Sequence, residues 1–598
     1  MSLRRALVAF AGLAALGVAA AATAQAPAAP APAFPPAAPV SREASAKGFG
    51  AYKPAQPYSE QVVTSFYLPM RDGTRIAVSL HRPARGGKAV EGRFPVIWHH
   101  TLDIQGPGAR GGPVGPETRE LSQMTYNGYV VAVVARRGAG ASFGVRRGYE
   151  DLTEAYDAYE VNEWLAAQSW STGAVGLYGC SNTGEAVMHV LTVRPPHLKA
   201  AFAGCFSWNR YDGFARGGIL ANWGTGPTRS VEEDMRAVPV QGDESRTLLR
   251  QAVEEHQAST NLFELMRSMP FRDSFSPLVM SRFWAEASPS SYLDQVRQAN
   301  VPLYIQAGWH DDFRREGLVA FANMAAGRRW IVIGPWLHCS NAGFELRNEQ
   351  LRFFDYWLKG IDTGITRDDP IHYYTENAPA GREWRSAKAW SGPAAGDRRL
   401  YLAGGALSPA VPAGAERQDA FEVDPAPTCA RQVASGNQTL YQPCHPVRGA
   451  ASYALAPLSA DLEVTGHPTL DVWVSSSAPE TNLFAYLEDV APDGTVTAIT
   501  DARQQLSLRK EAKPAWAYLG LPWHRGFAED SEPLKAGEAV RVRIDFLPVS
   551  YVFKAGHRLQ VSFAGSDYRE RVRTGAAPRL AIHTGPGKAS LITLPVAG

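Results

Sequence analysis

Three residues of this chain have the types and local contexts that ester or amide hydrolysis needs: Ser181, Asp311 and His338. Ser181 lies in the stretch 179–184, GCSNTG, between an apolar run and a helix-like segment. A serine on such a strand-to-helix turn presents its hydroxyl outside the sheet, beside the amides that begin the helix. The hydroxyl is a weak nucleophile unless a base removes its proton. We expect His338 to be that base and Asp311 to orient its imidazole ring.

The positions of these residues along the chain strengthen the prediction. Taken alone, GCSNTG also fits a turn without chemistry, and its second glycine comes one residue later than in the usual G-x-S-x-G. However, Asp311 and His338 each follow a strand-like run, at 301–306 and 329–333. The carboxyl ends of parallel strands meet at one edge of a sheet, and the order Ser, Asp, His is that of α/β hydrolases. Asp312 is the alternative acidic residue.

Acyl transfer also needs hydrogen-bond donors for the oxyanion, each typically worth about 3 kcal/mol. We expect one donor from the backbone amide of Asn182. The other should come from the loop after the strand-like run 94–98, which begins with His99 and His100. Either histidine could instead be a core residue.

Strand-like and helix-like segments alternate around these sites. The run 129–134 is entirely apolar, as in a strand covered on both faces, and 152–167 has helical periodicity. This alternation predicts a doubly wound parallel sheet of the α/β class. We assign residues 56–206 and 294–370 to this α/β-hydrolase core.

Two further regions have a different pattern. Residues 207–293 lose the strand pattern and contain helix-like segments, which predicts a helical cap over the active-site face. From 371 to 598, short alternating strands broken by Gly, Pro and Asp predict a C-terminal β-sandwich of the jelly-roll kind. The expected architecture is therefore an α/β-hydrolase core with a helical cap insertion and a jelly-roll domain.

The N-terminus predicts export. Arginines at 4 and 5 precede an apolar stretch and a small-residue cleavage site, so we interpret residues 1–24 as a signal peptide and 25–55 as a Pro/Ala-rich linker. The mature protein would be periplasmic or secreted. No later apolar run is long enough to span a bilayer, and a net charge of +2 gives no field that attracts nucleic acid. We expect neither a membrane nor a nucleic-acid partner, and the oligomeric state stays open.

Cysteine usage fits an oxidising compartment. Cys429 and Cys444 lie close together in a Pro-rich, loop-like region and form the predicted disulfide. Cys180 and Cys339, each beside a predicted catalytic residue, are interpreted as small buried hydrophobic residues. The cysteines lack metal-ligand spacing, so we expect neither a metal nor another cofactor.

These motifs together resemble the family of serine hydrolases that contains cocaine esterase, α-amino acid ester hydrolases and X-Pro dipeptidyl-peptidases. The family motifs G-x-S-Y-x-G, G-W-x-D-x-F and G-P-W-x-H correspond to residues 179–184, 308–313 and 334–338. The resemblance extends to the core, the helix after the sheet and the C-terminal domain, through residues 69–73, 353–360 and 553–558. It implies that Ser181, Asp311 and His338 form the triad and that the insertion is the family's cap.

Three positions depart from the family pattern. Asn182 stands where the family usually has a tyrosine, and Leu102 stands where the family often places a tyrosine hydroxyl as the second oxyanion donor. Residues 135–138, ARRG, replace the motif D-x-R-G. We hypothesise that His99 or His100 supplies the missing donor.

The predicted function is hydrolysis of an ester or amide bond in a small molecule through an acyl-enzyme. The triad alone does not separate an esterase from an X-Pro or other dipeptidyl-peptidase or acylase. Glu185 and Asp103 could bind a substrate amine, and Leu102 and Trp309 are placed in the substrate pocket.

Other interpretations stay open at this stage. Arg314 and Arg315 would favour an acidic acyl group, or would lie in a solvated loop. A catalytically impaired binding protein is the alternative from a different class. A carbohydrate-binding role of the C-terminal domain is a further one.

Overall fold

The structure is a computed structural model that describes residues 48–102, 121–148, 150–221, 230–390, 396–429, 442–446, 448–570 and 577–596. These residues all belong to one compact unit. The predicted signal peptide and most of the predicted linker lie outside the described residues, as does Asp103.

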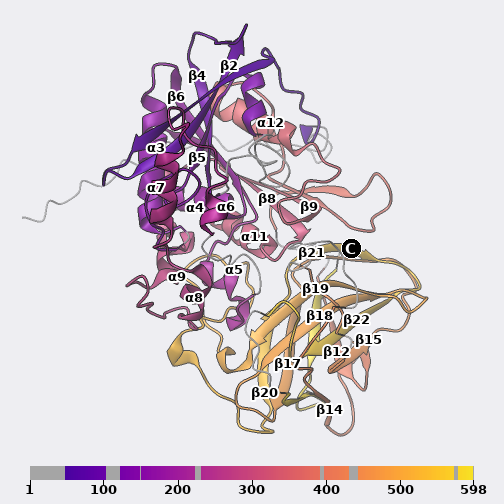
Figure 1. Ribbon diagram of the computed structural model, residues 1–598. Helices are drawn as coiled ribbons and strands as arrows, with labels where there is room; N and C mark the ends of the chain where they lie inside the picture. The colour runs from indigo at the N-terminus through magenta and orange to yellow at the C-terminus, as the bar shows by residue number, and fades with distance from the viewer. Residues whose placement is uncertain are drawn as a thin grey trace, which may run out of the picture. The chain divides into compact units, whose positions relative to one another are not determined.

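An 11-stranded mixed sheet organises the first part of the chain (Figure 1). Its strand order is β1-β2-β5-β4-β6-β7-β8-β9-β10-β11, with β3 paired to β2. The strands from β5 to β10 in this order run parallel, whereas β1 and β2 are antiparallel to their neighbours. The bounds are β1 Glu60–Pro69, β2 Arg75–Arg85, β3 Lys88–Ala89, β4 Phe94–Thr101, β5 Val130–Ala135, β6 Ser171–Cys180, β7 Leu198–Gly204, β8 Leu303–His310, β9 Arg329–Leu337, β10 Ile371–Tyr374 and β11 Trp384–Ala387.

Helices cover both faces of this sheet, which is why its central strands are apolar throughout. In β5, Val130 and Val134 pack into one apolar core, and Val131 and Val133 pack into another on the opposite face. The first core includes residues of α3 Leu152–Ala167, α4 Asn182–Val193, α10 Leu293–Ala299 and α11 Arg314–Asn323. The second includes η1 Gln123–Asn127 and α12 Leu346–Lys359. The α/β-hydrolase architecture is thus confirmed.

The first sheet extends past residue 370, where we expected the C-terminal domain to begin. β10 pairs in parallel with β9, with Ile371 opposite Ile331, and β11 adds to its outer edge. Ile371 is fully buried in the core of the first sheet. The sequence pattern of a short strand does not indicate which open sheet edge the strand will join.

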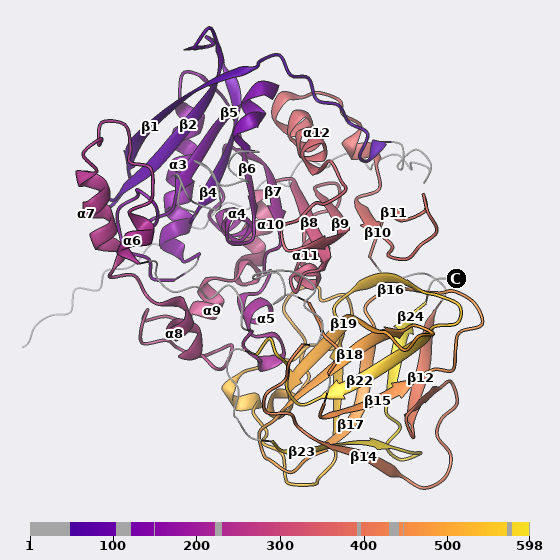
Figure 2. The same cartoon turned by 45° about the vertical axis from the view of Figure 1, so that its right-hand side comes forward.

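Short helices fill the region between β7 and β8 (Figure 2). Apolar side chains such as Leu265, Met269, Phe283 and Trp284 give this insertion a small core of its own. The bounds are α5 Arg210–Phe214, η2 Arg216–Gly218, α6 Val231–Asp234, α7 Thr247–His256, α8 Leu262–Arg267, α9 Phe283–Glu286 and η3 Pro289–Tyr292.

The C-terminal domain is all-β between its loops. Its main sheet has the order β14-β23-β17-β24-β12-β13-β15-β22-β18-β19, with β20 paired to β17, and β16 and β21 form a separate pair. Alternate residues such as Leu470, Val472 and Val474 point into one apolar core. The bounds are β12 Asp397–Ala403, β13 Ala406–Ser408, β14 Arg417–Glu422, β15 Ala450–Ala454, β16 Leu462–Gly466, β17 Thr469–Ser476, β18 Asn482–Val490, β19 Val496–Gln505, β20 Val540–Asp545, β21 Val549–Phe553, β22 Arg558–Ala564, β23 Arg579–Thr584 and β24 Leu591–Pro595.

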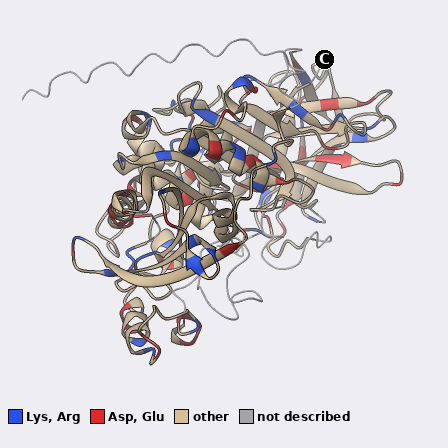
Figure 3. Ribbon diagram, turned by 90° about the horizontal axis from the view of Figure 1, so that it is seen from above, with Lys and Arg blue, Asp and Glu red and all other residues tan. Residues whose placement is uncertain are grey.

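Two further expectations from the sequence can be compared with the structure. The predicted disulfide between Cys429 and Cys444 is present. Among the described residues, every helix is too short or too polar to cross a membrane. Figure 3 shows lysines and arginines interspersed with acidic residues along the ribbon, in keeping with the small net charge of +2.

Candidate active site

Ser181 lies on the sharp turn between β6 and α4, with φ 62° and ψ −129°. A non-glycine residue adopts this conformation only when its surroundings impose it. The amide of Ser181 donates to the carbonyl of Gly204 at 3.0 Å. The Thr183 hydroxyl donates to the carbonyl of Cys180 and accepts from its amide, both at 2.7 Å. These bonds hold the turn and expose the serine at the end of the strand.

The two glycines that frame this turn are both required by close backbone approach. A Cβ on Gly179 would lie 2.3 Å from the carbonyl oxygen of Thr183. A Cβ on Gly184 would lie 2.3 Å from the carbonyl oxygen of Gly204, on the neighbouring strand β7. The late second glycine of GCSNTG is therefore the position where α4 crosses β7 without a side chain between them.

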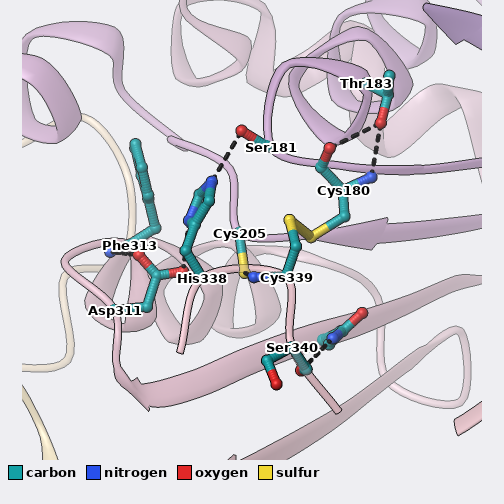
Figure 4. Close-up of a disulfide and its surroundings, with 10 residues drawn as sticks. Cys180, Ser181, Thr183, Cys205, Asp311, Phe313, His338, Cys339 and Ser340 are labelled. Carbon is teal, nitrogen blue, oxygen red and sulfur yellow. Dashed lines mark hydrogen bonds and ion pairs between the residues drawn. A yellow bond between two sulfur atoms is a disulfide. The ribbon is translucent and has the colours of Figure 1, made fainter. Parts of the chain in front are cut away.

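His338 connects the serine to a carboxylate. Its Nε2 lies 2.8 Å from the Ser181 hydroxyl, and its Nδ1 lies 3.0 Å from a carboxylate oxygen of Asp311 (Figure 4). An ionised carboxylate only accepts hydrogen bonds, so the proton of the neutral imidazole belongs on Nδ1. Nε2 is then the acceptor of the serine proton. The structure thus brings together the three residues predicted from the sequence.

The environment of Asp311 keeps it ionised. Its side chain is fully buried. Burial alone would raise the pKa of Asp311, but the nearby His338 and hydrogen bonds from His338, Cys205 and the Phe313 amide outweigh burial and lower that pKa. Asp312, the alternative acid, pairs instead with Arg503 at 2.7 Å.

The loop of Asp311 is attached to the C-terminal domain. The Arg314 guanidinium donates to the Asp311 carbonyl at 2.9 Å, to the Pro548 carbonyl at 2.9 Å and to the Thr500 hydroxyl at 3.0 Å. Arg315 is also buried and pairs with Glu316 and Asp545. The expectations of a solvated loop or of an acidic acyl pocket at these arginines are therefore wrong, because both side chains are used in packing α11 against the second domain.

The first amide of α4 belongs to Asn182, whose role as an oxyanion donor stays a prediction. Asn182 begins the helix, and amides in the first turn of a helix lack intrahelical acceptors. Its carbonyl oxygen accepts a hydrogen bond from the guanidinium of Arg136. Arg136 is the second residue of the ARRG stretch and is fully buried. The sequence marks this stretch only as a departure from the family motif, and the arginine at a strand end is the signal that points to Arg136.

His99 and His100 both lie inside β4 and are buried. His99 Nδ1 is 3.0 Å from the carbonyl oxygen of Tyr178 on the neighbouring strand. Burial, with smaller effects of Arg136 and His99, holds the pKa of His100 well below its ordinary value, so His100 is neutral. The role of either histidine as the second oxyanion donor stays a prediction.

Arg136 belongs to a buried cluster of charges behind the elbow. It pairs with Glu154 at 3.4 Å and with Glu150, and Arg210 pairs with Glu150 and with Glu185 at 2.9 Å. Each of these five residues is at most 5% exposed. Buried charges of this kind are stable only as a mutually paired set.

The predicted substrate residues have other partners. Glu185 accepts hydrogen bonds from the amide and the hydroxyl of Ser207, at 3.0 and 2.7 Å. Trp309 is 2% exposed in the core of the sheet, and its indole N–H donates to the Tyr374 carbonyl on β10. Leu102 is buried at the end of β4. Trp309 is therefore a packing residue in this structure.

Cys180 and Cys339 form a disulfide, with their Cα atoms 5.9 Å apart. Our interpretation of them as small buried hydrophobic residues is wrong. They are 159 residues apart in the chain, so spacing gives no sign of the bond. The bond forms because the ends of β6 and β9 converge above the sheet, where Ser181 and His338 also meet. Their positions next to these two residues were the available signal.

Comparison with known proteins identifies the class. The model of the X-Pro dipeptidyl-peptidase (S15) family matches residues 72–340, and that of the X-Pro dipeptidyl-peptidase C-terminal non-catalytic domain matches residues 362–590. "Putative serine esterase Mb1866c" of Mycobacterium bovis is 30% identical over 89% of this chain and 95% of that protein. Cocaine esterase of a Rhodococcus species is 25% identical over 90% of this chain and 98% of that protein.

Solved structures agree on the fold. A CocE/NonD family hydrolase from Staphylococcus aureus has a TM-score of 0.69 at 22% identity, over 90% of this chain and 94% of that one. The protein is therefore a serine hydrolase with the α/β-hydrolase fold. It belongs to the family that includes the X-Pro dipeptidyl-peptidases, cocaine esterase and related serine esterases.

Proposed function

We propose that this protein hydrolyses carboxylic esters through a covalent acyl-enzyme on Ser181. The observation that carries the proposal is the position of His338, whose two ring nitrogens contact Ser181 at 2.8 Å and Asp311 at 3.0 Å. A nucleophile, a base and an orienting carboxylate in hydrogen-bonded sequence form the arrangement that acyl transfer uses on several unrelated folds.

The reaction follows from these contacts. The Ser181 oxygen attacks the ester carbonyl as His338 Nε2 takes the hydroxyl proton, and Asp311 stabilises the imidazolium that forms. The amide of Asn182 donates to the oxyanion. The imidazolium then protonates the leaving alkoxide, which departs as an alcohol. Water attacks the acyl-enzyme by the same route, releasing the carboxylic acid and the free serine.

Relatives and local contacts both favour an ester as the substrate. The relative with 30% identity and the cocaine esterase are named as esterases, and each aligns along nearly its whole length. Recognition of a substrate amine needs a carboxylate that is available to it. Glu185 is already engaged by Ser207 and Arg210, which disfavours this role.

X-Pro dipeptidyl-peptidase activity on the same triad is the second candidate. It is favoured by the description of the matching family model and by a Bacillus anthracis relative, "Putative Xaa-Pro dipeptidyl-peptidase", at 25% identity. That relative is covered over only 66% of its length, whereas the esterases are covered over 95% and 98%. We therefore place ester hydrolysis first.

We also propose that the protein is exported to the periplasm or the medium. The support is the Arg-led apolar stretch followed by a small-residue cleavage site in residues 1–24. Two disulfides, Cys180–Cys339 and Cys429–Cys444, are in keeping with an oxidising compartment. Expression of the full chain with periplasmic fractionation and N-terminal sequencing tests this. A cytoplasmic protein that retains Met1 would contradict it.

A hydrolysis panel tests the proposed reaction. Aryl esters, amino-acid esters and X-Pro anilides are offered to the wild type and to Ser181→Ala, which serves as the blank. We expect aryl esters to be hydrolysed with the highest kcat/KM and the Ser181→Ala variant to retain only background turnover. A preference for X-Pro anilides would replace esterase by dipeptidyl-peptidase activity. Turnover that survives in Ser181→Ala would refute the mechanism.

A further inference from the structure

A covalent bond joins the two loops that carry the nucleophile and the base. Cys180 directly precedes Ser181, and Cys339 directly follows His338. The disulfide between these cysteines fixes the end of β6 to the end of β9 (Figure 4). Two intervening strands, β7 and β8, separate these ends within the sheet. The hydrogen bond between Ser181 and His338 and the disulfide therefore both connect the end of β6 with the end of β9.

A third sulfur links the acidic residue to the same bond. Cys205 follows β7, and its thiol donates a hydrogen bond to the carboxylate of Asp311. Its sulfur accepts a hydrogen bond from the Cys339 amide at 3.3 Å. The sulfur atoms of Cys180, Cys205 and Cys339 lie within 4.8 Å of one another. We call these three residues the sulfur clamp.

The backbone around the clamp is held in conformations that residues other than glycine rarely adopt. Ser181, Cys205 and Cys339 have φ angles of 62°, 48° and 56°, in a region that favours glycine. Such conformations cost on the order of 1–3 kcal/mol each and persist only where the surroundings impose them. The clamp is one such constraint, and it acts on the residues that flank or form the catalytic contact.

We propose that the sulfur clamp positions Ser181 against His338 and makes catalysis dependent on the redox state of the Cys180–Cys339 bond. The proposal rests on the function proposed above. A dithiol reductant opens the clamp in two steps. One of its thiolates attacks a disulfide sulfur, and its second thiol then releases the mixed disulfide. The products are two protein thiols and the oxidised reductant. Cys339 is the least buried of the three cysteines, so we expect attack there.

Opening the clamp should lower kcat more than it changes KM, because the clamp joins the residues next to the reacting groups Ser181 and His338. A misplacement of about 1 Å between reacting groups costs about 100-fold in rate. We therefore expect reduction to lower kcat by about 10- to 100-fold, with KM changed less than about twofold. Reoxidation should restore the original kcat.

The experiment compares the wild type with two double variants. Cys180→Ser/Cys339→Ser removes the clamp bond, and Cys429→Ser/Cys444→Ser removes the other disulfide as the matched control. Each protein is assayed on an aryl ester before and after dithiothreitol, with reduction confirmed by thiol counting and folding followed by circular dichroism. The wild type and the control should lose kcat on reduction. The Cys180→Ser/Cys339→Ser variant should begin at the low kcat and not respond.

Any other outcome contradicts the proposal that the sulfur clamp controls catalysis. A fully reduced, folded wild type with unchanged kcat contradicts it, as does a Cys429→Ser/Cys444→Ser variant that no longer responds to reductant. If kcat falls only in proportion to the loss of folded protein, the disulfide stabilises the fold and does not position the catalytic residues. Wild-type turnover that does not depend on Ser181 refutes the proposed function, and the clamp with it. Ser181-dependent turnover that survives reduction refutes the clamp and leaves the function intact.

Discussion

The carboxylate of Asp312 lies 2.7 Å from the guanidinium of Arg503, so the residue next to Asp311 is anchored in the C-terminal domain. Arg216 from the helical insertion and Arg569 from the second domain approach the same carboxylate at 3.8 and 3.7 Å. All four side chains are nearly inaccessible to solvent. The second domain thus contacts the loop that holds Asp311.

Neutralising Asp312 should therefore destabilise the protein. Asp312→Asn leaves three buried arginines with less compensating charge, and breaking a buried ion pair costs about 3–5 kcal/mol. We expect a lower free energy of unfolding by that order, and a lower kcat because Asp311 loses its anchored neighbour. Denaturant titration and ester hydrolysis measure the two effects. Asp471→Asn is the control, since its partner Arg541 is 56% exposed and exposed pairs contribute about 0–1 kcal/mol. Equal effects of the two substitutions would contradict the prediction.

Gly184 gives a second prediction, about the turn itself. In Gly184→Ala the new Cβ meets the Gly204 carbonyl oxygen at 2.3 Å, so α4 must move away from β7. Since Ser181 precedes this helix, we expect kcat to fall by about 10- to 100-fold. Gly327→Ala is the matched control, because its Cβ has open space and only its positive φ costs stability, about 1 kcal/mol. A Gly184→Ala variant with normal kcat would show that the turn does not need this close approach.

Arg136 gives a third prediction, about the buried charges behind the turn. It is fully buried, pairs with Glu150 and Glu154, and donates to the carbonyl of Asn182. Arg136→Met removes the cation and leaves two buried carboxylates, which we expect to destabilise the fold by about 3–5 kcal/mol. Loss of the hydrogen bond from Arg136 should also let Asn182 move. This movement should weaken oxyanion binding and lower kcat with little change in KM. Matched measurements on Arg71→Met, a partly exposed arginine with 37% side-chain exposure, provide the comparison. A change confined to KM would contradict the assigned role.

Much of the fold followed from the sequence, because period-2 strands and interleaved helices are local patterns. The triad followed as well, since its residue types fall at strand ends in a fixed order. The partners of β10 did not, because a short strand carries no mark of the edge it joins. Arg314 and the Cys180–Cys339 bond were also misjudged. Each depends on contacts between residues far apart in the chain, which spacing does not reveal.

Buried histidines predict a loss of stability in acid. Burial lowers the pKa of His81 to about 4, from an ordinary value of 6.5. The unfolded chain therefore binds the proton first as the pH falls. This contribution to stability is complete above pH 6.5 and is lost progressively down to about pH 4. This lowering of the His81 pKa corresponds to about 3 kcal/mol.

Substitution of His81 tests this pH dependence. In His81→Leu the fall in the free energy of unfolding between pH 6.5 and 4 should be smaller than in the wild type by about 3 kcal/mol. His197→Leu removes a histidine that is 50% exposed and serves as the control. Urea titrations at several pH values measure the slopes. An equal fall in the free energy of unfolding in the wild type and in His81→Leu would contradict this prediction. It would show that the folded protein binds the His81 proton as readily as the unfolded chain does.

Covalent labelling at Ser181 tests the central claim most directly. A fluorophosphonate reacts with a serine only when a base activates it, and it forms a stable adduct that peptide mass spectrometry locates. We predict one adduct per chain, on the peptide containing Ser181, with labelling abolished in Ser181→Ala and slowed at least about 100-fold in His338→Ala. An adduct on another serine, or unchanged labelling in either variant, would contradict the assignment of Ser181 and His338 as nucleophile and base.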